Sequence, residues 1–256
     1  MNTIEKKIVG QQFKRSIKSY DEHAIVQKDI CRKLFSILAK HHKKQDNSIF
    51  EIGAGTGFLT CEILSNSYVS KLYVNDMVEE LMLPLTNILQ SYPSVDYQWV
   101  MGDAEELQFP NQLDIIVSAS TIQWFNNVQA FFNNSHKSLK SGGKLAFSTF
   151  GPNNFHQISS ITGNGIQYKS LDELQTMLSV NFKIIEVIEE TITLEFAKPE
   201  DVIRHMKQTG VNGTRNTRWT KKSLLTFCNE YEKRFNTNSG VSLTYHPLYF
   251  VCEKVG

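Results

Sequence analysis

Short apolar runs alternate with helical patterns along the first 150 residues of the chain. Five runs have the length and composition of strands that are buried on both faces: 49–52, 71–75, 97–101, 114–118 and 144–149. Apolar residues recur with helical spacing between them, at 57–66, 78–90 and 127–140, and a glycine pair follows the last of these. This alternation predicts an α/β fold with a parallel sheet and right-handed crossovers.

Two longer apolar runs, 182–196 and 241–255, follow this region and enclose a helical insert at 199–237. They come after the five predicted strands and are long enough to pair with each other. We therefore expect them to add an antiparallel edge to the parallel sheet.

The residues ahead of the first strand have a helical pattern that belongs to no strand–helix unit. We expect them to pack over the sheet or over its ligand. Because no repeat, linker or low-complexity segment interrupts the chain, we predict one domain, 1–256. Its parts are a helical cap at about 1–45, a core at 46–150, and a second half at 151–256.

Composition and charge exclude several classes of protein. The chain has 27 basic and 26 acidic residues, so its net charge of +1 gives no general attraction for nucleic acid. No window approaches the roughly 20 apolar residues of a membrane span. The first ten residues lack the apolar core of a signal peptide, so we expect a cytoplasmic protein.

The four cysteines are widely separated, at Cys31, Cys61, Cys228 and Cys252. They form neither a CxxC pair nor a Cys/His spacing suited to zinc. We therefore expect free, buried thiols and no metal site.

A glycine-rich loop follows the first predicted strand in the sequence EIGAGTG (51–57). Gly53, Gly55 and Gly57 allow the backbone to pass close to a ligand where a Cβ atom would collide. The spacing is not the GxGxxG of a dinucleotide site, and no Gly-Lys-Ser/Thr of a P-loop is present. A loop between a strand and a helix is where open α/β sheets bind ligands.

An acidic residue lies at the end of each of three successive predicted strands: Glu51, Asp76 and Asp103. At the second strand a carboxylate can accept both hydrogen bonds of a ribose diol. At the third it can reach the exocyclic amine of adenine. Together the three acids predict an electronegative crevice that suits a cationic nucleoside without phosphate.

These motifs resemble those of class I S-adenosylmethionine-dependent methyltransferases. EIGAGTG resembles their first motif, Asp76 their second-strand acid, GDAEEL (102–107) their third motif, and DIIVSASTIQW (114–124) their fourth-strand segment. The resemblance implies a Rossmann-like, mostly parallel seven-stranded sheet with an antiparallel edge strand, N-terminal helices and a helical lid insert. It also implies S-adenosylmethionine as cofactor, held by Glu51, Gly53, Ala54, Gly55, Thr56, Gly57, Asp76, Met77, Asp103, Ala104 and Ser118.

Segments outside this half resemble the malonyl-acyl-carrier-protein O-methyltransferase family, which acts in biotin synthesis. The similar segments are SYDEHAIVQ (19–27), IQW (122–124), STFGP (148–152), RHMKQTGVN (204–212) and LTYH (243–246). The resemblance implies methylation of the free carboxylate of malonyl-acyl-carrier protein, or of malonyl-coenzyme A. That carboxylate is already ionised at pH 7, so no general base is required.

The same resemblance suggests which residues hold the methyl acceptor. Arg204 is our preferred ligand for the malonyl carboxylate, because a guanidinium can bind a carboxylate at two points. Tyr20 and Tyr245 are expected to donate hydrogen bonds to the acceptor. Gln123, Trp124 and His246 are expected to position it, with Trp124 forming a wall of the pocket.

An acidic carrier protein calls for a basic docking surface. Two clusters qualify, one on the N-terminal helix and one in the insert: Lys14, Arg15, Lys18, and Arg215, Arg218, Lys221, Lys222. Two alternatives stay open. One is a methyltransferase for another small acid or a quinone precursor, and the other is a non-catalytic nucleoside-binding partner subunit.

Overall fold

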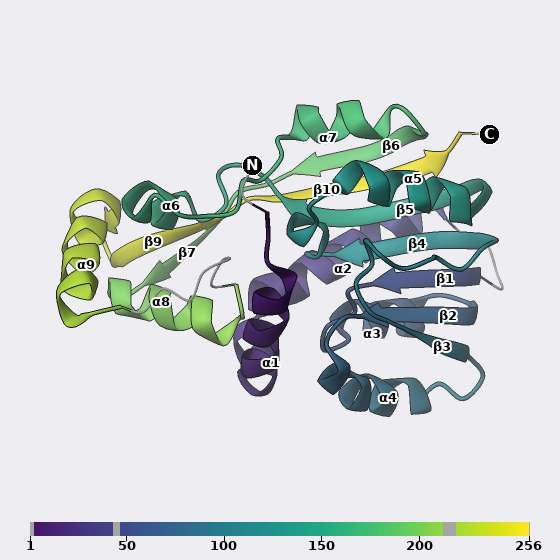
Figure 1. Ribbon diagram of the computed structural model, residues 1–256, viewed down its shortest axis with the longest axis horizontal. Coiled ribbons are helices and arrows are strands. Elements are labelled where there is room, and N and C mark those ends of the chain that lie inside the picture. Colours follow the sequence, from purple (N-terminus) through teal and green to yellow (C-terminus); the bar gives the residue numbers. More distant parts are fainter. Residues whose placement is uncertain (1–2, 43–46, 212–218, 256) are drawn as a thin grey trace.

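The computed structural model of the 256-residue chain describes residues 3–42, 47–211 and 219–255. Its centre is a seven-stranded sheet in the order β3-β2-β1-β4-β5-β10-β6 (Figure 1). The strands are β1 Asn47–Ile52, β2 Val69–Asp76, β3 Asp96–Met101, β4 Leu113–Ala119, β5 Leu139–Phe150, β6 Phe182–Glu189 and β10 Pro247–Lys254.

One strand, β10, runs antiparallel to its neighbours β5 and β6, and the remaining pairings in this sheet are parallel. The predicted parallel sheet with one antiparallel strand is therefore confirmed. The antiparallel strand is not at the edge, however, because β6 pairs with its outer side and takes the edge position.

Helices cover both faces of the sheet. On one face lie α2 Ile25–His41, α3 Phe58–Asn66 and α4 Met82–Gln90, and on the other lie α5 Val128–Ser138 and α7 Leu171–Leu178 (Figure 1). Successive residues of β1 belong to the two different cores: Ile49 packs with the first set, and Phe50 and Ile52 pack with the second. This double burial explains why the strands are continuous apolar runs.

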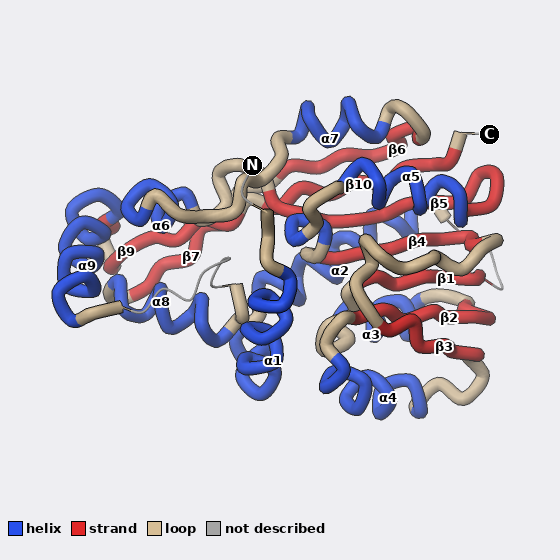
Figure 2. Tube along the Cα trace, in the orientation of Figure 1, coloured by secondary structure: helices blue, strands red, loops and turns tan. Residues whose placement is uncertain are grey.

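A second, three-stranded sheet has the order β7-β9-β8 and forms a separate lobe with three helices (Figure 2). Its elements are β7 Ile192–Phe196, β8 Asn236–Thr237, β9 Gly240–Tyr245, α6 His156–Thr162, α8 Pro199–Gln208 and α9 Lys221–Phe235. Each of the two long apolar runs breaks and contributes one strand to each sheet. The second run breaks at His246, just before Pro247, which has no N–H to donate.

The remaining differences from the sequence prediction are local. The helix expected at 127–140 ends at Ser138, because β5 already begins at Leu139. The glycine pair expected to stop that helix lies inside β5, where the pairing register with β4 shifts. Helices α6 and α7 and the short 3₁₀ turns η1 Glu79–Leu81 and η2 Ile122–Trp124 were not predicted as separate elements.

The helix α1 Lys6–His23 stands beside the carboxyl ends of the parallel strands, as Figure 1 shows. No helix in the described ranges has the length and apolar character needed to cross a membrane. All four cysteines are free thiols; Cys31, Cys228 and Cys252 are buried, but Cys61 is exposed, so the expectation of buried thiols is wrong there. Within the same ranges, no group of three His, Cys, Asp or Glu side chains is arranged to bind a metal.

Candidate active site

A cavity lies at the carboxyl ends of β1, β2, β3 and β4. The loops that follow these strands line it at 53–56, 76–78, 102–104 and 119–121. Helix α1 closes it from the other side with Phe13, Tyr20 and their neighbours. The cavity is therefore at the edge of the sheet where the glycine loop predicted a ligand site.

The glycine loop follows β1 with a positive φ at Gly53 (+68°) and Gly55 (+58°). A Cβ atom on Gly53 would lie 2.3 Å from Oγ1 of Thr121, so this position packs tightly against the β4 loop. A Cβ on Gly55 would meet nothing within 4 Å, and Gly55 lines the cavity. The second glycine thus leaves space for a ligand, whereas the first fixes the loop. Ala54 and Thr56 also line the cavity, and Gly57 lies outside its lining at the start of α3.

Asp76 at the end of β2 holds two of these loops together. Its Oδ2 accepts a hydrogen bond from the Gly55 N–H at 2.9 Å, and its Oδ1 accepts one from the Val78 N–H at 2.9 Å. Burial raises the pKa of Asp76, and these backbone hydrogen bonds oppose the rise. Asp76 lines the cavity together with Met77, so both predicted residues are at the site.

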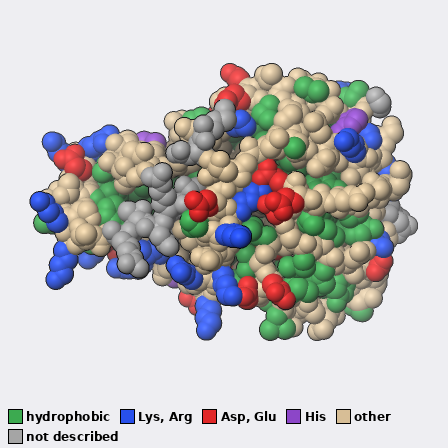
Figure 3. All heavy atoms as spheres, viewed as in Figure 1, with side chains coloured by type: hydrophobic (Ala, Val, Ile, Leu, Met, Phe, Trp, Pro, Cys, Tyr) green, Lys and Arg blue, Asp and Glu red, His purple; other side chains and the backbone are tan. Residues whose placement is uncertain are grey.

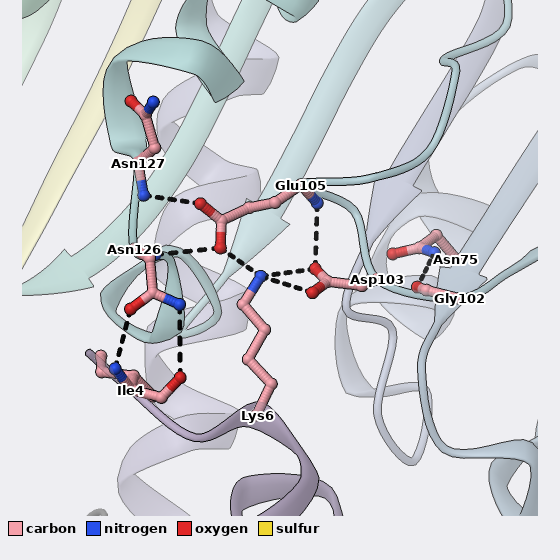
Figure 4. A network of polar contacts seen from close by, with 8 residues as sticks. All are labelled: Ile4, Lys6, Asn75, Gly102, Asp103, Glu105, Asn126 and Asn127. Atoms are coloured by element: carbon pink, nitrogen blue, oxygen red, sulfur yellow. Dashed lines mark hydrogen bonds and ion pairs between the residues drawn. The ribbon is translucent and has the colours of Figure 1, made fainter.

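Asp103, at the end of β3, lines the cavity beside Ala104 and is paired with a cation (Figure 4). Lys6 of α1 donates to both of its carboxylate oxygens, at 2.6 and 2.7 Å, and also forms an ion pair with Glu105. All three side chains are less than 20% exposed. The sequence did not distinguish Lys6 from the other basic residues of the N-terminal helix.

The same network fastens the chain just before α1 to the loop after η2. Glu105 accepts hydrogen bonds from the N–H groups of Asn126 at 2.9 Å and Asn127 at 2.6 Å. The Asn126 side chain accepts from the Ile4 N–H at 2.8 Å and donates to the Ile4 carbonyl at 3.3 Å, as Figure 4 shows. The start of α1 is therefore held against the cavity by both charge and backbone hydrogen bonds.

Two residues predicted to bind the cofactor lie outside the cavity lining. Glu51 is 1% exposed and accepts a hydrogen bond from Thr60 Oγ1 at 2.7 Å, and burial raises its pKa to about 8. It therefore adds little negative charge to the site at neutral pH. Ser118 is fully buried and donates to the Ile52 carbonyl at 3.0 Å, and Ser120 and Thr121 line the cavity in its place.

Three buried polar atoms of cavity residues have no hydrogen-bond partner among the described residues. They are Thr56 Oγ1, Ser120 Oγ and Trp124 Nε1. Native proteins rarely leave such atoms unsatisfied, and a bound ligand is one way in which they are paired. Ser120 also has a positive φ of +51°, which is uncommon for a residue with a side chain.

Aromatic rings form the wall between the glycine loop and α1. Tyr20 stacks on Phe58 with ring centroids 5.7 Å apart, and Trp124 meets Phe13 edge-on at 6.0 Å. Burial raises the pKa of Tyr20, so its hydroxyl stays a neutral donor. Tyr20 and Trp124 are therefore at the cavity, as predicted.

Three other residues expected to contact the acceptor are not at the cavity. The Arg204 side chain is 62% exposed and pairs with Asp201 of its own helix at 2.7 Å. Tyr245 is fully buried, with its hydroxyl 2.7 Å from His205 Nε2. His246 is 4% exposed and forms the corner between β9 and β10, where its Nε2 lies 2.7 Å from Glu189 Oε1. Their roles are structural, so these assignments are corrected.

A second, wider depression, here called the side groove, is lined by residues of α1, η2, α8 and the segment after β5. Its members include Gln12, Arg15, Gln123, Asn154, Phe155 and Lys207. Phe125 lines both the cavity and the side groove. Gln123, predicted to position the acceptor, is therefore on the groove side, where its Nε2 donates to the Ser120 carbonyl at 2.6 Å.

The predicted docking residues lie on exposed surface where the structure describes them. Arg15 and Lys18 are exposed on α1, Lys14 is exposed and pairs with Glu80, and Lys221 and Lys222 are exposed at the start of α9. Figure 3 shows Lys and Arg side chains along α1 and around α9 on this face. Arg215 and Arg218 lie outside the described residues.

Comparison with known proteins places the fold among methyltransferases. A family model described as a methyltransferase domain matches residues 50–147. The solved structure of YcgJ from Bacillus subtilis superposes with a TM-score of 0.64 at 17% identity, covering 88% of this chain and 99% of that one. The N-methyltransferase NodS from Bradyrhizobium japonicum, in complex with S-adenosyl-L-homocysteine, superposes with a TM-score of 0.60 at 12% identity, covering 97% of this chain and 99% of NodS.

Sequence relatives extend the similarity over nearly the whole chain. The malonyl-[acyl-carrier protein] O-methyltransferase of Bacteroides helcogenes is 35% identical, covering 98% of this chain and 99% of the relative. That of Acinetobacter baylyi is 34% identical, with 98% of each chain covered. The relative from Bacteroides fragilis is 39% identical over 97% of this chain, which spans 50% of that longer protein. The chain belongs to the malonyl-[acyl-carrier protein] O-methyltransferase family.

Proposed function

We propose that the protein transfers the methyl group of S-adenosylmethionine to the free carboxylate of malonyl-acyl-carrier protein. The product is the malonyl methyl ester, which enters the pimeloyl branch of biotin synthesis. The observation that carries the proposal is the cavity at the strand ends, where Asp76 fixes the glycine loop beside unsatisfied polar atoms. Membership of the family supports the choice of acceptor.

The residues of the cavity fit S-adenosylmethionine. Gly55 leaves open space where a side chain would stand, and Asp76 offers carboxylate oxygens suited to a ribose diol. Thr56 Oγ1 and Ser120 Oγ are available to pair with an amino-acid group. When bound, the cofactor supplies a methyl group on a sulfonium, which a carboxylate can attack directly.

The protein's own residues contribute positioning and the exclusion of water. Phe13, Tyr20, Phe58 and Trp124 form an apolar wall, which removes solvent from a charged nucleophile and so strengthens the remaining polar contacts. The Trp124 indole N–H has no partner in the described structure and is suited to orient the malonyl carboxylate.

No base is required, because the nucleophile is ionised at neutral pH. Among the described residues that line the cavity, the charged side chains are Lys6, Asp76 and Asp103. Lys6 is already paired with Asp103, so the acceptor is held by neutral donors and not by a free cation. This agrees with the need for a nucleophile that is not weakened by a tight ion pair.

The exposed basic residues Lys18, Lys221 and Lys222 are proposed to attract the acidic carrier protein. Helix α1 lines the cavity, and we propose that it moves with α8 as a lid when the carrier docks. Hydrogen bonds between the two helices support this view: Ser19 Oγ donates to the Gln208 carbonyl at 3.1 Å, and the Gln208 side chain lies 2.7 Å from His23 Nε2.

The direct test is to incubate the protein with malonyl-carrier protein and S-adenosylmethionine labelled in its methyl group. We expect a labelled methyl ester on the malonyl group, identified by mass spectrometry. Free malonate and a quinone precursor serve as parallel acceptors; a product with either in place of the carrier substrate would favour the small-molecule alternative. Donor binding without any product would favour a non-catalytic partner subunit.

A further inference from the structure

We infer that the side groove binds the phosphopantetheine arm that carries the malonyl thioester, with Arg15 and Lys207 facing its phosphate. The inference rests on the proposed function, because it concerns how that substrate reaches the cavity. It assigns a binding role to residues of α1, η2 and α8 that the donor site does not use.

The side groove is continuous with the donor cavity. Phe125 lines both, and two pairs of neighbouring residues divide between them. On α1, Gln12 lines the groove and Phe13 lines the cavity; on η2, Gln123 lines the groove and Trp124 lines the cavity. A long substrate lying in the groove therefore has its reactive end beside the aromatic wall of the cavity.

The lining of the groove matches the chemistry of a pantetheine chain, which alternates amide groups with short apolar segments. Phe155, Ile158 and Met206 supply apolar surface. Gln12 supplies the polar handle: it is 8% exposed, and its Oε1 has no hydrogen-bond partner within the described ranges. A buried, unsatisfied amide oxygen is suited to accept from an amide N–H of the arm.

The other buried amide of the groove is already occupied. Asn154 donates to Tyr168 Oη at 2.9 Å and accepts from the His246 N–H at 3.2 Å, so it has a structural role. The contrast singles out Gln12 as the side chain that is open to a ligand.

The charges on the groove favour an anion at its outer end. Its described lining contains three basic residues, Arg15, Lys169 and Lys207, and one acidic residue, Glu173. The Glu173 carboxylate already accepts from the Ser170 N–H at 2.7 Å in the cap of α7. Arg15 and Lys207 are exposed and have no ion pair with any described residue, unlike Lys6 and Lys14 of the same N-terminal helix. A guanidinium and an ammonium at the rim suit a phosphodiester.

The test uses a series of malonyl thioesters that share the reactive end but differ in length and charge. They are malonyl-phosphopantetheine, malonyl-pantetheine without phosphate, and the malonyl thioester of N-acetylcysteamine. The variants are Arg15→Ala, Lys207→Ala and Gln12→Ala. Lys7→Ala is the matched control, because Lys7 is an exposed lysine of α1 that lines neither the cavity nor the groove.

For Arg15→Ala and Lys207→Ala, KM for malonyl-phosphopantetheine should rise about tenfold, the loss expected for one charge-assisted contact. Neither change should alter KM for the two thioesters that lack phosphate. Gln12→Ala should raise KM for both pantetheine substrates and leave the short thioester unaffected. Lys7→Ala should change none of these values.

Two results would overturn the inference while leaving the proposed function intact. One is an unchanged KM for malonyl-phosphopantetheine in Arg15→Ala, Lys207→Ala and Gln12→Ala. The other is an equal loss for all three thioesters, which would mean that the variants disturb the cavity itself. If the wild-type protein methylates no malonyl thioester, the proposed function fails, and the groove assignment fails with it. Thermal unfolding and calorimetric donor affinity should match the wild type in every variant used.

Discussion

The donor cavity and the side groove are adjacent, yet they are built in different ways. The cavity comes from loops that directly follow four strands, so each of its groups is placed by a short local motif. The side groove comes from α1, η2, α8 and the segment after β5, which are far apart in the chain. The first can be recognised from the sequence, whereas the second exists only after the lobe has packed.

The two sites also differ in how their charges are satisfied. In the cavity Lys6 neutralises Asp103 and Glu105, and Glu51 is kept neutral by burial. At the groove rim Arg15 and Lys207 have no ion-pair partner in the described parts of the chain. A pocket with internally balanced charge suits a ligand that is enclosed, while unpaired rim charge suits a ligand that arrives with opposite charge.

The largest effect that we predict concerns Glu51. The folded state keeps its proton up to a pKa of about 8, whereas the unfolded chain releases it near 4.5, so stability falls as pH rises between these values. Glu51→Gln removes this loss and should raise the free energy of unfolding by about 4 kcal/mol at pH 8. Urea denaturation at pH 5 and pH 8 measures it. A gain of the same size at pH 5 would rule out ionisation as the cause.

The second prediction compares two ion pairs of α1. Lys6→Ala leaves Asp103 and Glu105 close together in a mostly buried place without their cation, and should cost about 3 kcal/mol of unfolding free energy. Lys14→Ala removes an exposed pair with Glu80 and should leave the denaturation midpoint unchanged. Equal effects from the two variants would show that the network at the cavity has no special role.

The third prediction separates the two sites directly. Asp76→Ala should weaken S-adenosylmethionine binding by about 1–3 kcal/mol, because a charged acceptor is lost and the Gly55 and Val78 N–H groups lose their partner. Gln12→Ala should leave donor affinity unchanged, because Gln12 lines the groove only. Isothermal titration calorimetry measures both. A similar loss in the two variants would mean that cavity and groove act as one site.

The smallest effect concerns His205 in the lobe. Burial, with a smaller contribution from His23, lowers its pKa from 6.5 to about 4. As pH falls from 6.5 to 4 the unfolded chain takes up a proton that the folded state does not, so stability falls in that window. After allowing for partial exposure, the loss should be about 1–2 kcal/mol, and His205→Gln should remove it. Thermal unfolding at pH 7 and pH 5 tests this; identical pH profiles in wild type and variant would contradict it.

The sequence was informative where function depends on a few consecutive residues. The glycine loop, Asp76 and Asp103 were predicted correctly to lie at one edge of the sheet, because the carboxyl ends of parallel strands must meet there. Ser118 was wrong by two positions. Strand β4 continues to Ala119, so Ser118 points into the sheet, and Ser120 is the first serine to reach the cavity.

The acceptor side could not be predicted in the same way. Arg204, Tyr245 and His246 were chosen as functional groups, but their directions depend on a second sheet whose strands are continuations of β6 and β10. The break at His246 reverses what an uninterrupted strand would expose. Gln12 and Lys6 also escaped notice, because an amphipathic pattern does not show which part of a helix faces a loop more than 90 residues away.

The position of β10 has a consequence for how the chain is made. It pairs with β5 on one side and β6 on the other, although residues 247–254 are synthesised after all the other strands of the sheet. Until they leave the ribosome, β5 and β6 each present an unpaired edge, and the two cannot be joined. We therefore expect the nascent chain to remain prone to aggregation until this stretch emerges, and to gain its full cooperativity in a late step that requires long-range pairing.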